Sequence, residues 1–169
     1  MAKPTLSDWA VLATLTEEPT HGFRLAALFA KDGDLGTVWT IQRPQIYRAL
    51  EHLETWEWAE TVGTEPGDAG PPRLRYAATP LGRETVERWR VTPVIHLRDA
   101  RSELLLKLVF LERQRLEPEP LITAQIVRFR AVQQEYETRL AKTEGAERVA
   151  LEWRLETARA ALTFLERQL

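Results

Sequence analysis

The sequence contains no cysteine. This absence excludes a disulfide scaffold, a zinc site built from thiolates and a cysteine nucleophile. No apolar stretch approaches the ~20 residues that a membrane-spanning helix requires, and Met1–Pro4 lacks the apolar run of a signal peptide. We therefore expect a cytoplasmic protein with no membrane partner.

Residues that carry catalysis are also scarce. Ser7 and Ser102 are the only serines, neither lies in a nucleophile elbow, and there is no glycine-rich phosphate loop. The three histidines are not accompanied by acidic residues at metal-ligand spacing. Asp32 and Asp34 are typical of the start of a calcium loop, but the twelfth position holds Arg43 instead of a glutamate. We expect no enzymatic activity, no metal and no other cofactor.

The overall charge is not that of a protein coated with basic residues. Apolar residues make up 44% of the chain and charged residues 28%, which predicts a packed core. The net charge is −2, divided into −3 for residues 1–90 and +1 for residues 91–169. An acidic balance opposes nucleic-acid binding, unless the basic side chains gather on one surface.

Glycine, proline and hydrophobic spacing divide the chain into two parts. Residues 1–92 show three short helices, a hairpin and a further helix, whereas residues 93–169 are helical throughout, with Thr92-Pro93 as the break. We predict a mainly α protein with a small β wing, in which a winged helix-turn-helix domain (1–92) precedes a C-terminal helical dimerisation domain (93–169).

Particular residues predict where the elements of the first part begin. Ser7 or Asp8 is expected to cap the first helix, and Thr20 the second, in which Phe23 is one of the apolar positions. The third helix starts near Pro44 and turns Ile46, Ala49, Leu50 and Leu53 inward. Segments 58–62 and 73–77 read as strands joined by a long loop over 63–72, and Thr79-Pro80 opens the next helix.

The second part predicts a helical homodimer. One helix is expected over residues 101–117, and a longer one, ending near Lys142, has an apolar seam at steps of four and three. The last helix has two apolar stripes, one with Val149, Trp153, Ala160 and Phe164 and the other with Leu151, Leu155, Leu162 and Leu169. Two stripes exceed what one neighbouring helix covers. The expected dimerisation residues are Ile126, Phe129, Tyr136, Trp153 and Phe164.

The third helix and the hairpin contain side chains suited to DNA. The helix presents Gln42, Arg43, Gln45, Tyr47 and Arg48 away from its inward set. Arginine and glutamine read base edges, and arginine and tyrosine also bind phosphates. Arg73 and Arg75 point the same way on a regular strand. The alternative is a solvated helix start and an ordinary charged strand, and Glu65 and Asp68 in the intervening loop would repel phosphates.

Three segments together resemble the PadR family of bacterial transcriptional regulators. They are Thr20–Leu25, Ile46–Glu54 and Pro72–Gly82, which are similar to the family signatures His-Gly-Tyr-x-Leu, Leu-Tyr-x-x-Leu-x-x-Leu and Arg-x-x-Tyr-x-x-Thr-x-x-Gly. Leu104–Phe110 resembles, more weakly, the first helix of the dimerisation region in longer members. Two departures stand out: Pro44-Gln45 replaces small residues, and Glu57 replaces a frequent turn glycine.

The resemblance implies a homodimeric repressor that binds an inverted-repeat DNA operator and is released by a small aromatic compound. It implies backbone contacts for Tyr47 and wing contacts for Arg73 and Arg75. The alternative function is a ligand- or protein-interaction module that keeps this scaffold without specific DNA binding.

The chain has six tryptophans, and they raise the question of a ligand site. Trp9, Trp89 and Trp153 lie on helices and could stack against a planar aromatic ligand. The alternative is that each fills a core or an interface. His21 is interpreted as a structural hydrogen-bonding residue rather than a metal ligand.

Overall fold

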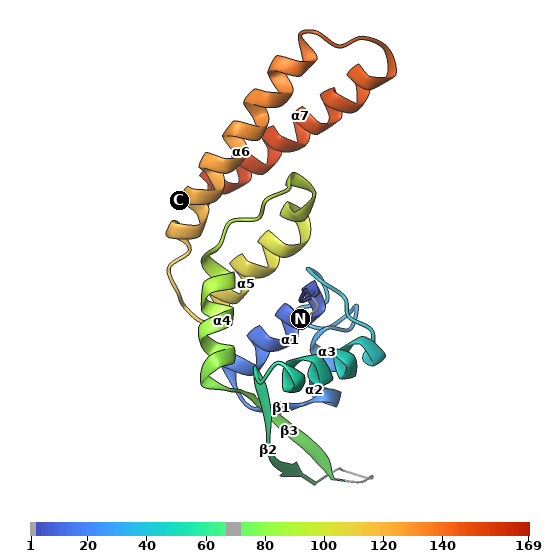
Figure 1. The fold of residues 1–169 in the computed structure, drawn as a ribbon, viewed down its shortest axis with the longest axis vertical. Coiled ribbons are helices and arrows are strands. Elements are labelled where there is room, and N and C mark those ends of the chain that lie inside the picture. The colour runs from blue at the N-terminus through green and yellow to red at the C-terminus, as the bar shows by residue number, and fades with distance from the viewer. Residues whose placement is uncertain (1–2, 67–71) are drawn as a thin grey trace. The chain divides into compact units, whose positions relative to one another are not determined.

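The computed structural model describes residues 3–66 and 72–169. Residues 67–71 of the loop expected over 63–72, among them Asp68, lie outside the described residues. The chain divides into two compact units, Met1–Arg90 and Val91–Leu169. Figure 1 shows the elements of each unit. Below, each unit is considered by itself.

Helix α1 (Leu6–Glu17) forms the centre of the first unit, and its residues from Ala10 to Leu15 are buried. Its cap is Thr5, not Ser7 or Asp8. The Thr5 backbone N–H donates to Asp8 Oδ2 at 2.7 Å, and the Asp8 N–H donates to Thr5 Oγ1 at 3.3 Å. This reciprocal pair is a capping box, in which Asp8 is the third helical residue. Oδ1 of the buried Asp8 also lies 3.0 Å from Nδ1 of His52, which ties α1 to helix α3 (Arg43–Thr55).

Two further helices complete the helical part of this unit. Helix α2 (Gly22–Leu28) is capped by His21 rather than Thr20, because His21 Nδ1 accepts the Arg24 N–H at 3.0 Å. This bond confirms His21 as a structural hydrogen-bonding residue. Helix α3 (Arg43–Thr55) buries the four apolar side chains predicted to face inward, Ile46, Ala49, Leu50 and Leu53.

A small antiparallel sheet follows, with strand order β1-β3-β2. Strands β2 (Ala59–Glu65) and β3 (Arg73–Ala78) form the predicted hairpin, which extends beyond the helices of the unit in Figure 1. Strand β1 (Thr20–His21) was not predicted; its two residues pair with Tyr76 and Arg75. Helix α4 (Pro80–Val91) begins directly after β3. This is the winged helix-turn-helix arrangement.

The turn that ends α3 holds a glutamate in a conformation that favours glycine. Glu57 has a φ of 59°, and Trp58 donates its N–H to the Leu53 carbonyl at 2.8 Å. This is the Schellman ending, whose left-handed residue is usually glycine. The geometry of this turn explains why glycine is frequent at this position in the family that the sequence resembles.

We predict that Glu57→Gly stabilises the protein by about 0.5–1 kcal/mol, because glycine removes the side-chain clash of the left-handed conformation. Urea unfolding should show a higher midpoint with an unchanged slope. The control is Glu60→Gly in β2, which should lower the midpoint because glycine weakens a strand. A lower midpoint for Glu57→Gly would contradict the strained turn.

The second unit is helical. It contains a 3₁₀ turn (Leu97–Asp99), a π-helical turn (Ala100–Leu104), α5 (Leu105–Arg113), α6 (Glu119–Leu140) and α7 (Gly145–Glu166). The prediction of a single helix over 101–117 is therefore wrong at both ends, because α5 is preceded by the π-helical turn and ends at Arg113. At its C-terminal end, Arg115 has a φ of 53° and Leu116 donates its N–H to the Leu111 carbonyl at 2.9 Å, which closes a second Schellman turn.

Helices α6 and α7 pack side by side as a hairpin (Figure 1). Their core joins Val94 and Leu104 to Ile122, Phe129 and Leu165, among others. Of the two stripes predicted on α7, the one with Leu151, Leu155 and Leu162 is buried, although Leu169 lies beyond the helix and is 66% exposed. The other is exposed, as shown by Val149, Trp153, Ala160 and Phe164.

Candidate nucleic-acid interface

The N-cap and the first half of α3 present all five side chains that the sequence predicted for DNA. Each is exposed: Gln42, Arg43, Gln45, Tyr47 and Arg48. The Gln42 backbone N–H donates to Gln45 Oε1 at 3.0 Å, so the Gln45 side chain helps to close the helix start. The Gln45 amide NH₂ remains available as a donor. The unusual Pro44-Gln45 pair therefore supports the helix start as well as offering a base-reading group.

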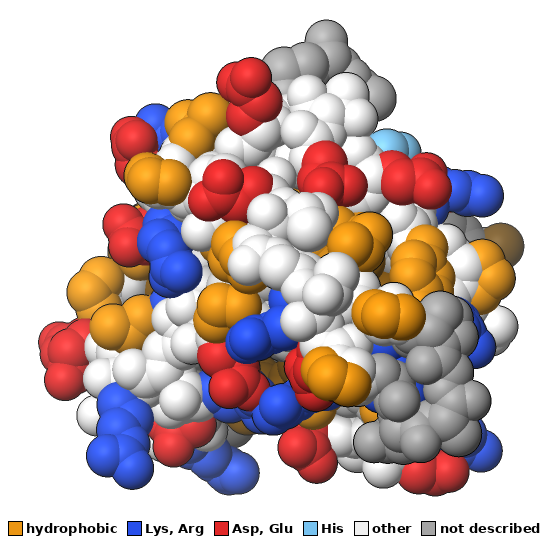
Figure 2. Space-filling view, turned by 90° about the horizontal axis from the view of Figure 1, so that it is seen from below, with side chains coloured by type: hydrophobic (Ala, Val, Ile, Leu, Met, Phe, Trp, Pro, Cys, Tyr) orange, Lys and Arg blue, Asp and Glu red, His pale blue; other side chains and the backbone are white. Residues whose placement is uncertain are grey.

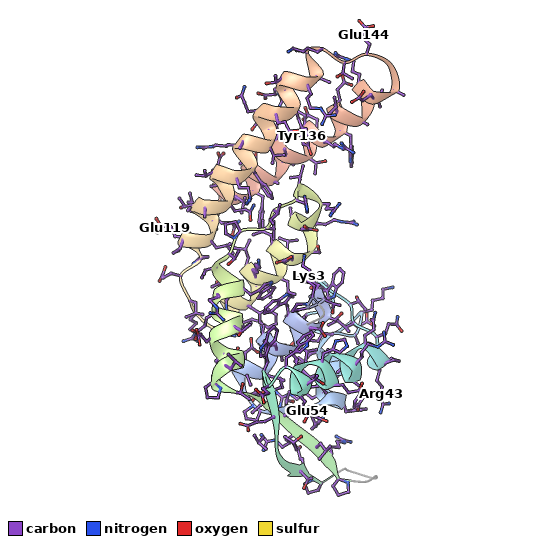
Figure 3. All side chains as sticks on the ribbon, in the orientation of Figure 1. Lys3, Arg43, Glu54, Glu119, Tyr136 and Glu144 are labelled. Atoms are coloured by element: carbon purple, nitrogen blue, oxygen red, sulfur yellow. The ribbon has the colours of Figure 1, made fainter. Side chains whose placement is uncertain are left out.

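The charge of α3 changes along its length. Arg43 and Arg48 lie in its first half, whereas Glu51 and Glu54 lie in its second. Figure 3 labels Arg43 and Glu54 at the two ends of the helix. The Glu54 carboxylate is hydrogen-bonded to the wing, because its Oε1 accepts the Thr61 hydroxyl at 3.0 Å. The first half of α3 is therefore the part suited to a phosphate-rich partner.

An aromatic side chain connects α3 with the wing. The Arg43 guanidinium lies 5.9 Å and the Arg73 guanidinium 4.7 Å from the ring centre of Phe23. Both distances fall within the range of cation–π attraction. Arg43 also lies 5.8 Å from the Tyr47 ring. Phe23, one of the apolar residues predicted in the second helix, is 50% exposed, whereas Leu25 of the same helix is buried.

These residues surround a hollow of about 440 Å³. Three segments that are far apart in the sequence line it, namely His21–Phe23, Arg43 with Tyr47, and β3 with the preceding Pro72. Gly22 permits the close approach, since a Cβ there would lie 2.8 Å from the Tyr47 ring. The three segments of the family resemblance thus meet at one place.

The two wing arginines differ in their surroundings. Arg73 lies over Phe23, whereas the Arg75 Nη2 donates to the Pro19 carbonyl at 3.0 Å. Arg75 Nε is also 3.9 Å from Glu65 Oε2. Arg75 therefore holds the wing against the segment before β1, and Arg73 is the wing arginine that faces the hollow.

Tyr76 of β3 also lines the hollow. Its pKa is raised above the ordinary tyrosine value, first by burial and then by the charges of Glu54, Tyr47 and Glu51. The phenol consequently stays protonated at neutral pH and can donate a hydrogen bond.

The tryptophans of the first unit are packed against one another. The Trp9 ring stacks on Trp58 at 5.4 Å and on Trp89 at 5.3 Å, with Trp89 only 7% exposed. This packing favours the core interpretation for Trp9 and Trp89, since their rings already serve as stacking partners.

The residues predicted for dimerisation fall into two groups. Ile126 and Phe129 are buried by their own unit. Trp153 is 76% exposed and, with the half-buried Tyr136, borders a hollow of about 540 Å³. Figure 3 labels Tyr136 on α6. Phe164, 40% exposed, borders another hollow.

The described part of the chain holds neither a metal-binding cluster nor a membrane-spanning helix. Over residues 3–66 and 72–169, no three side chains of His, Cys, Asp or Glu gather in a way that would hold a metal ion. No helix in that part of the chain is long and apolar enough to cross a bilayer. The face in Figure 2 carries acidic and basic side chains in a mixture, without a broad region of one sign.

Comparison with known proteins gives similarities to one family. A curated relative, the probable transcriptional regulator Rv1176c of Mycobacterium tuberculosis, is 32% identical over 96 residues, which are 57% of this chain and 49% of that protein. The chain thus aligns with about half the length of this relative.

Two solved structures of Bacillus subtilis PadR are similar over most of the chain. The complex with operator DNA is 21% identical, with a TM-score of 0.49, and the match covers 96% of this chain and 97% of the other. The complex with p-coumaric acid is 19% identical, with a TM-score of 0.47, and the match covers 96% of each.

The match to a protein family lies in the unit that contains the hollow. Residues 11–88 match the profile of the Transcriptional regulator PadR-like family. They run from the middle of α1 through most of α4 and include all three segments around the hollow. Through this region, the chain is similar to the PadR-like family of transcriptional regulators.

Proposed function

We propose that the protein is a sequence-specific DNA-binding transcriptional regulator, a repressor that acts as a homodimer on an inverted-repeat operator. The observation that carries the proposal is the convergence of Arg43 and Arg73 on the Phe23 ring, which places α3 and the wing at one surface. Residues 1–92 form the DNA-binding domain in this proposal and residues 93–169 the dimerisation domain.

DNA binding uses the first half of α3 in the major groove. Arg43, Gln45 and Arg48 are the side chains with the chemistry to read base edges, and Tyr47 donates to the backbone. Arg73 binds the adjacent phosphates from the wing. The acidic total of residues 1–90 does not oppose this mode, because the arginines of the interface lie on α3 and the wing, whereas Glu17, Glu84 and Glu87 lie on α1 and α4.

A homodimer is supported by the exposed stripe of α7. Val149, Trp153 and Phe164 are all at least 40% exposed on a helix whose opposite stripe is already buried. Burying such a stripe against a second copy removes apolar surface from water. Two α3 helices would then contact half-sites about 34 Å apart, one turn of DNA.

We also propose that a small aromatic compound releases the DNA. The hollow bordered by Tyr136 and Trp153 offers two rings for stacking, and Arg98 and Arg154 line it as well. Selection of bound fragments from the source genome, repeated with candidate aromatic compounds, tests both the operator and this release.

The direct test removes one arginine from α3 and one from the wing. We predict that Arg48→Ala combined with Arg73→Ala weakens specific binding to the upstream DNA about 1,000-fold or more, because the homodimer loses four contacts to bases or phosphates at about 1–1.5 kcal/mol each. A gel-shift titration measures the change. The control is Arg128→Ala with Arg167→Ala, an equal loss of charge at exposed positions of the second unit. Unchanged binding in the first variant, or an equal loss in the control, would contradict the proposal.

Salt dependence separates this function from the alternative. Specific DNA binding should weaken steeply between ~50 and ~200 mM salt, because each neutralised phosphate releases counterions. A protein- or ligand-interaction module on the same scaffold should bind no operator at any salt concentration.

A further inference from the structure

We propose that the hollow between α2, α3 and β3 is a phosphate-binding subsite, which holds one backbone phosphodiester of the bound DNA between the recognition helix and the wing. The inference rests on the proposed function and adds two residues to it, His21 and Phe23, neither of which was predicted from the sequence to contact or position DNA.

Two cations are held at the hollow before any DNA arrives. Arg43 and Arg73 come from different elements, and both lie over the Phe23 ring, at 5.9 and 4.7 Å from its centre. A guanidinium attracted to an aromatic face loses less side-chain freedom on binding a ligand than one that extends into water. Phe23 therefore acts as a positioning residue for two phosphate-binding arginines.

His21 supplies a donor that lacks an acceptor. Its side chain is 7% exposed, and its Nδ1 accepts the Arg24 N–H at 3.0 Å. An imidazole that accepts at Nδ1 has its proton on Nε2. In the described part of the chain, Nε2 has no hydrogen-bond partner, although the residue lines the hollow. Nε2 is not one of the buried side-chain atoms without a partner, so its N–H opens on the hollow, where a phosphate oxygen would accept its hydrogen bond.

The remaining lining suits an anion as well. Tyr47 and Tyr76 contribute phenol groups, and none of the described residues that line the hollow is acidic. The nearby carboxylate of Glu54 accepts the Thr61 hydroxyl. The hollow thus combines two cations, one imidazole N–H and two hydroxyl groups around about 440 Å³.

Two substitutions separate this subsite from the helix contacts. His21→Asn keeps a side-chain oxygen that can cap α2 and removes the Nε2 donor. Phe23→Leu keeps an apolar side chain and removes the aromatic face. Phe23→Tyr, which keeps that face, is the matched control. Melting temperatures of all three variants show whether the fold is retained.

Fluorescence anisotropy with a 30-base-pair duplex of the upstream DNA is measured over a salt series. We expect His21→Asn and Phe23→Leu to weaken binding about 5- to 30-fold. Phe23→Leu, which removes the ring that positions two arginines, should also reduce the slope of log affinity against log salt by about one per subsite, whereas His21→Asn removes a neutral donor and should leave the slope unchanged. Phe23→Tyr should remain within about twofold of the parent protein.

Neutral methylphosphonate linkages, placed one at a time along the duplex, identify the phosphate. At one linkage in each half-site the parent protein should lose affinity. His21→Asn and Phe23→Leu should be insensitive to that linkage, because the substitution and the neutral linkage remove the same contact. If either variant unfolds, the other variant and the linkage scan of the parent protein still decide the outcome.

The outcomes distinguish the two proposals. If the parent protein binds the duplex and both variants keep its affinity, slope and linkage pattern, the subsite is wrong and the proposed function stands. If the parent protein binds no DNA at low salt, the proposed function is wrong, and the subsite is wrong with it.

Discussion

Replacing Gln125 by leucine is expected to destabilise the protein by about 2–5 kcal/mol. Gln125 is fully buried on α6, and its amide forms two hydrogen bonds to one residue. Its Oε1 accepts the Val94 N–H at 2.8 Å, and its Nε2 donates to the Val94 carbonyl at 3.2 Å. Leucine has a similar size but offers neither atom, so both backbone groups of Val94 are left unpaired.

The magnitude follows from the number of groups left without partners. Val94 is 3% exposed, which prevents water from replacing the amide. Each buried polar group without a hydrogen bond costs about 1–3 kcal/mol, and the added apolar contact of leucine offsets only part of two such losses. Urea unfolding followed by far-ultraviolet circular dichroism measures the change as a lower midpoint.

Gln134→Leu is the matched control, since Gln134 lies exposed on the same helix. It should alter the free energy of unfolding by less than about 0.5 kcal/mol. Equal midpoints for Gln125→Leu and the parent protein would show that the Val94 backbone finds other partners.

This pair of bonds matters because of where Val94 lies in the chain. The segment Thr92–Val94 directly follows α4, and Lys107 holds its other end by donating from Nζ to the Thr92 carbonyl at 2.7 Å. Lys107 is itself buried, and burial lowers its pKa, although the ion pair with Glu103 at 2.8 Å opposes that shift. A polar side chain on each of α5 and α6 thus fixes the start of the second unit.

The sequence predicted the local structure well where one physical signal dominated. Hydrophobic spacing identified the inward face of α3, and the long loop between two β-compatible segments identified the wing. The caps depend on geometry, because Thr5, Ser7 and Asp8 all have suitable oxygens, and only the structure shows that Thr5 and Asp8 act as a pair. A histidine is an uncommon cap, so the residue types alone point to Thr20.

Properties that depend on distant residues were not predictable. Phe23 fits the apolar pattern of α2, yet its ring is exposed and lies beside Arg43 and Arg73. These arginines are 20 and 50 residues away in the chain. Arg73 and Arg75 are two residues apart, so strand alternation predicts the same direction for both. The difference arises because β1, a strand too short to detect in the sequence, pairs with β3 and brings the Pro19 carbonyl to Arg75. Phe129 fits the dimer seam but is buried within its own unit.

The glycine of α4 provides the second large expected effect. Gly82→Ala is predicted to destabilise the protein by about 3 kcal/mol or more. A Cβ at this position would lie 2.0 Å from the Trp58 carbonyl oxygen and 2.8 Å from its carbonyl carbon. Both are backbone atoms, which cannot move aside as a side chain does, and inserted atoms in a packed interior cost about 1–3 kcal/mol even where the surroundings adjust.

The surrounding hydrogen bonds explain why α4 cannot retreat. Thr79 donates its N–H to the Trp58 carbonyl at 3.0 Å and its hydroxyl to the Glu57 carbonyl at 2.7 Å. The same hydroxyl oxygen accepts the Gly82 N–H at 3.0 Å. The threonine and the glycine three residues later therefore form one junction between the end of α3, the wing and α4, which is the physical basis of the Thr-x-x-Gly part of the family signature.

The sign of the change is decisive, because local and tertiary effects oppose each other. Within an isolated helix, alanine is more stable than glycine by about 1 kcal/mol, so Gly82→Ala would raise the urea midpoint if helix propensity dominated. The close approach predicts a lower midpoint. Glu84→Ala, at an exposed position of the same helix, controls for the general effect of alanine and should change the free energy of unfolding by less than about 0.5 kcal/mol. A raised midpoint for Gly82→Ala would mean that α4 does not pack against the Trp58 backbone, and the junction that orients the wing would have to be placed elsewhere.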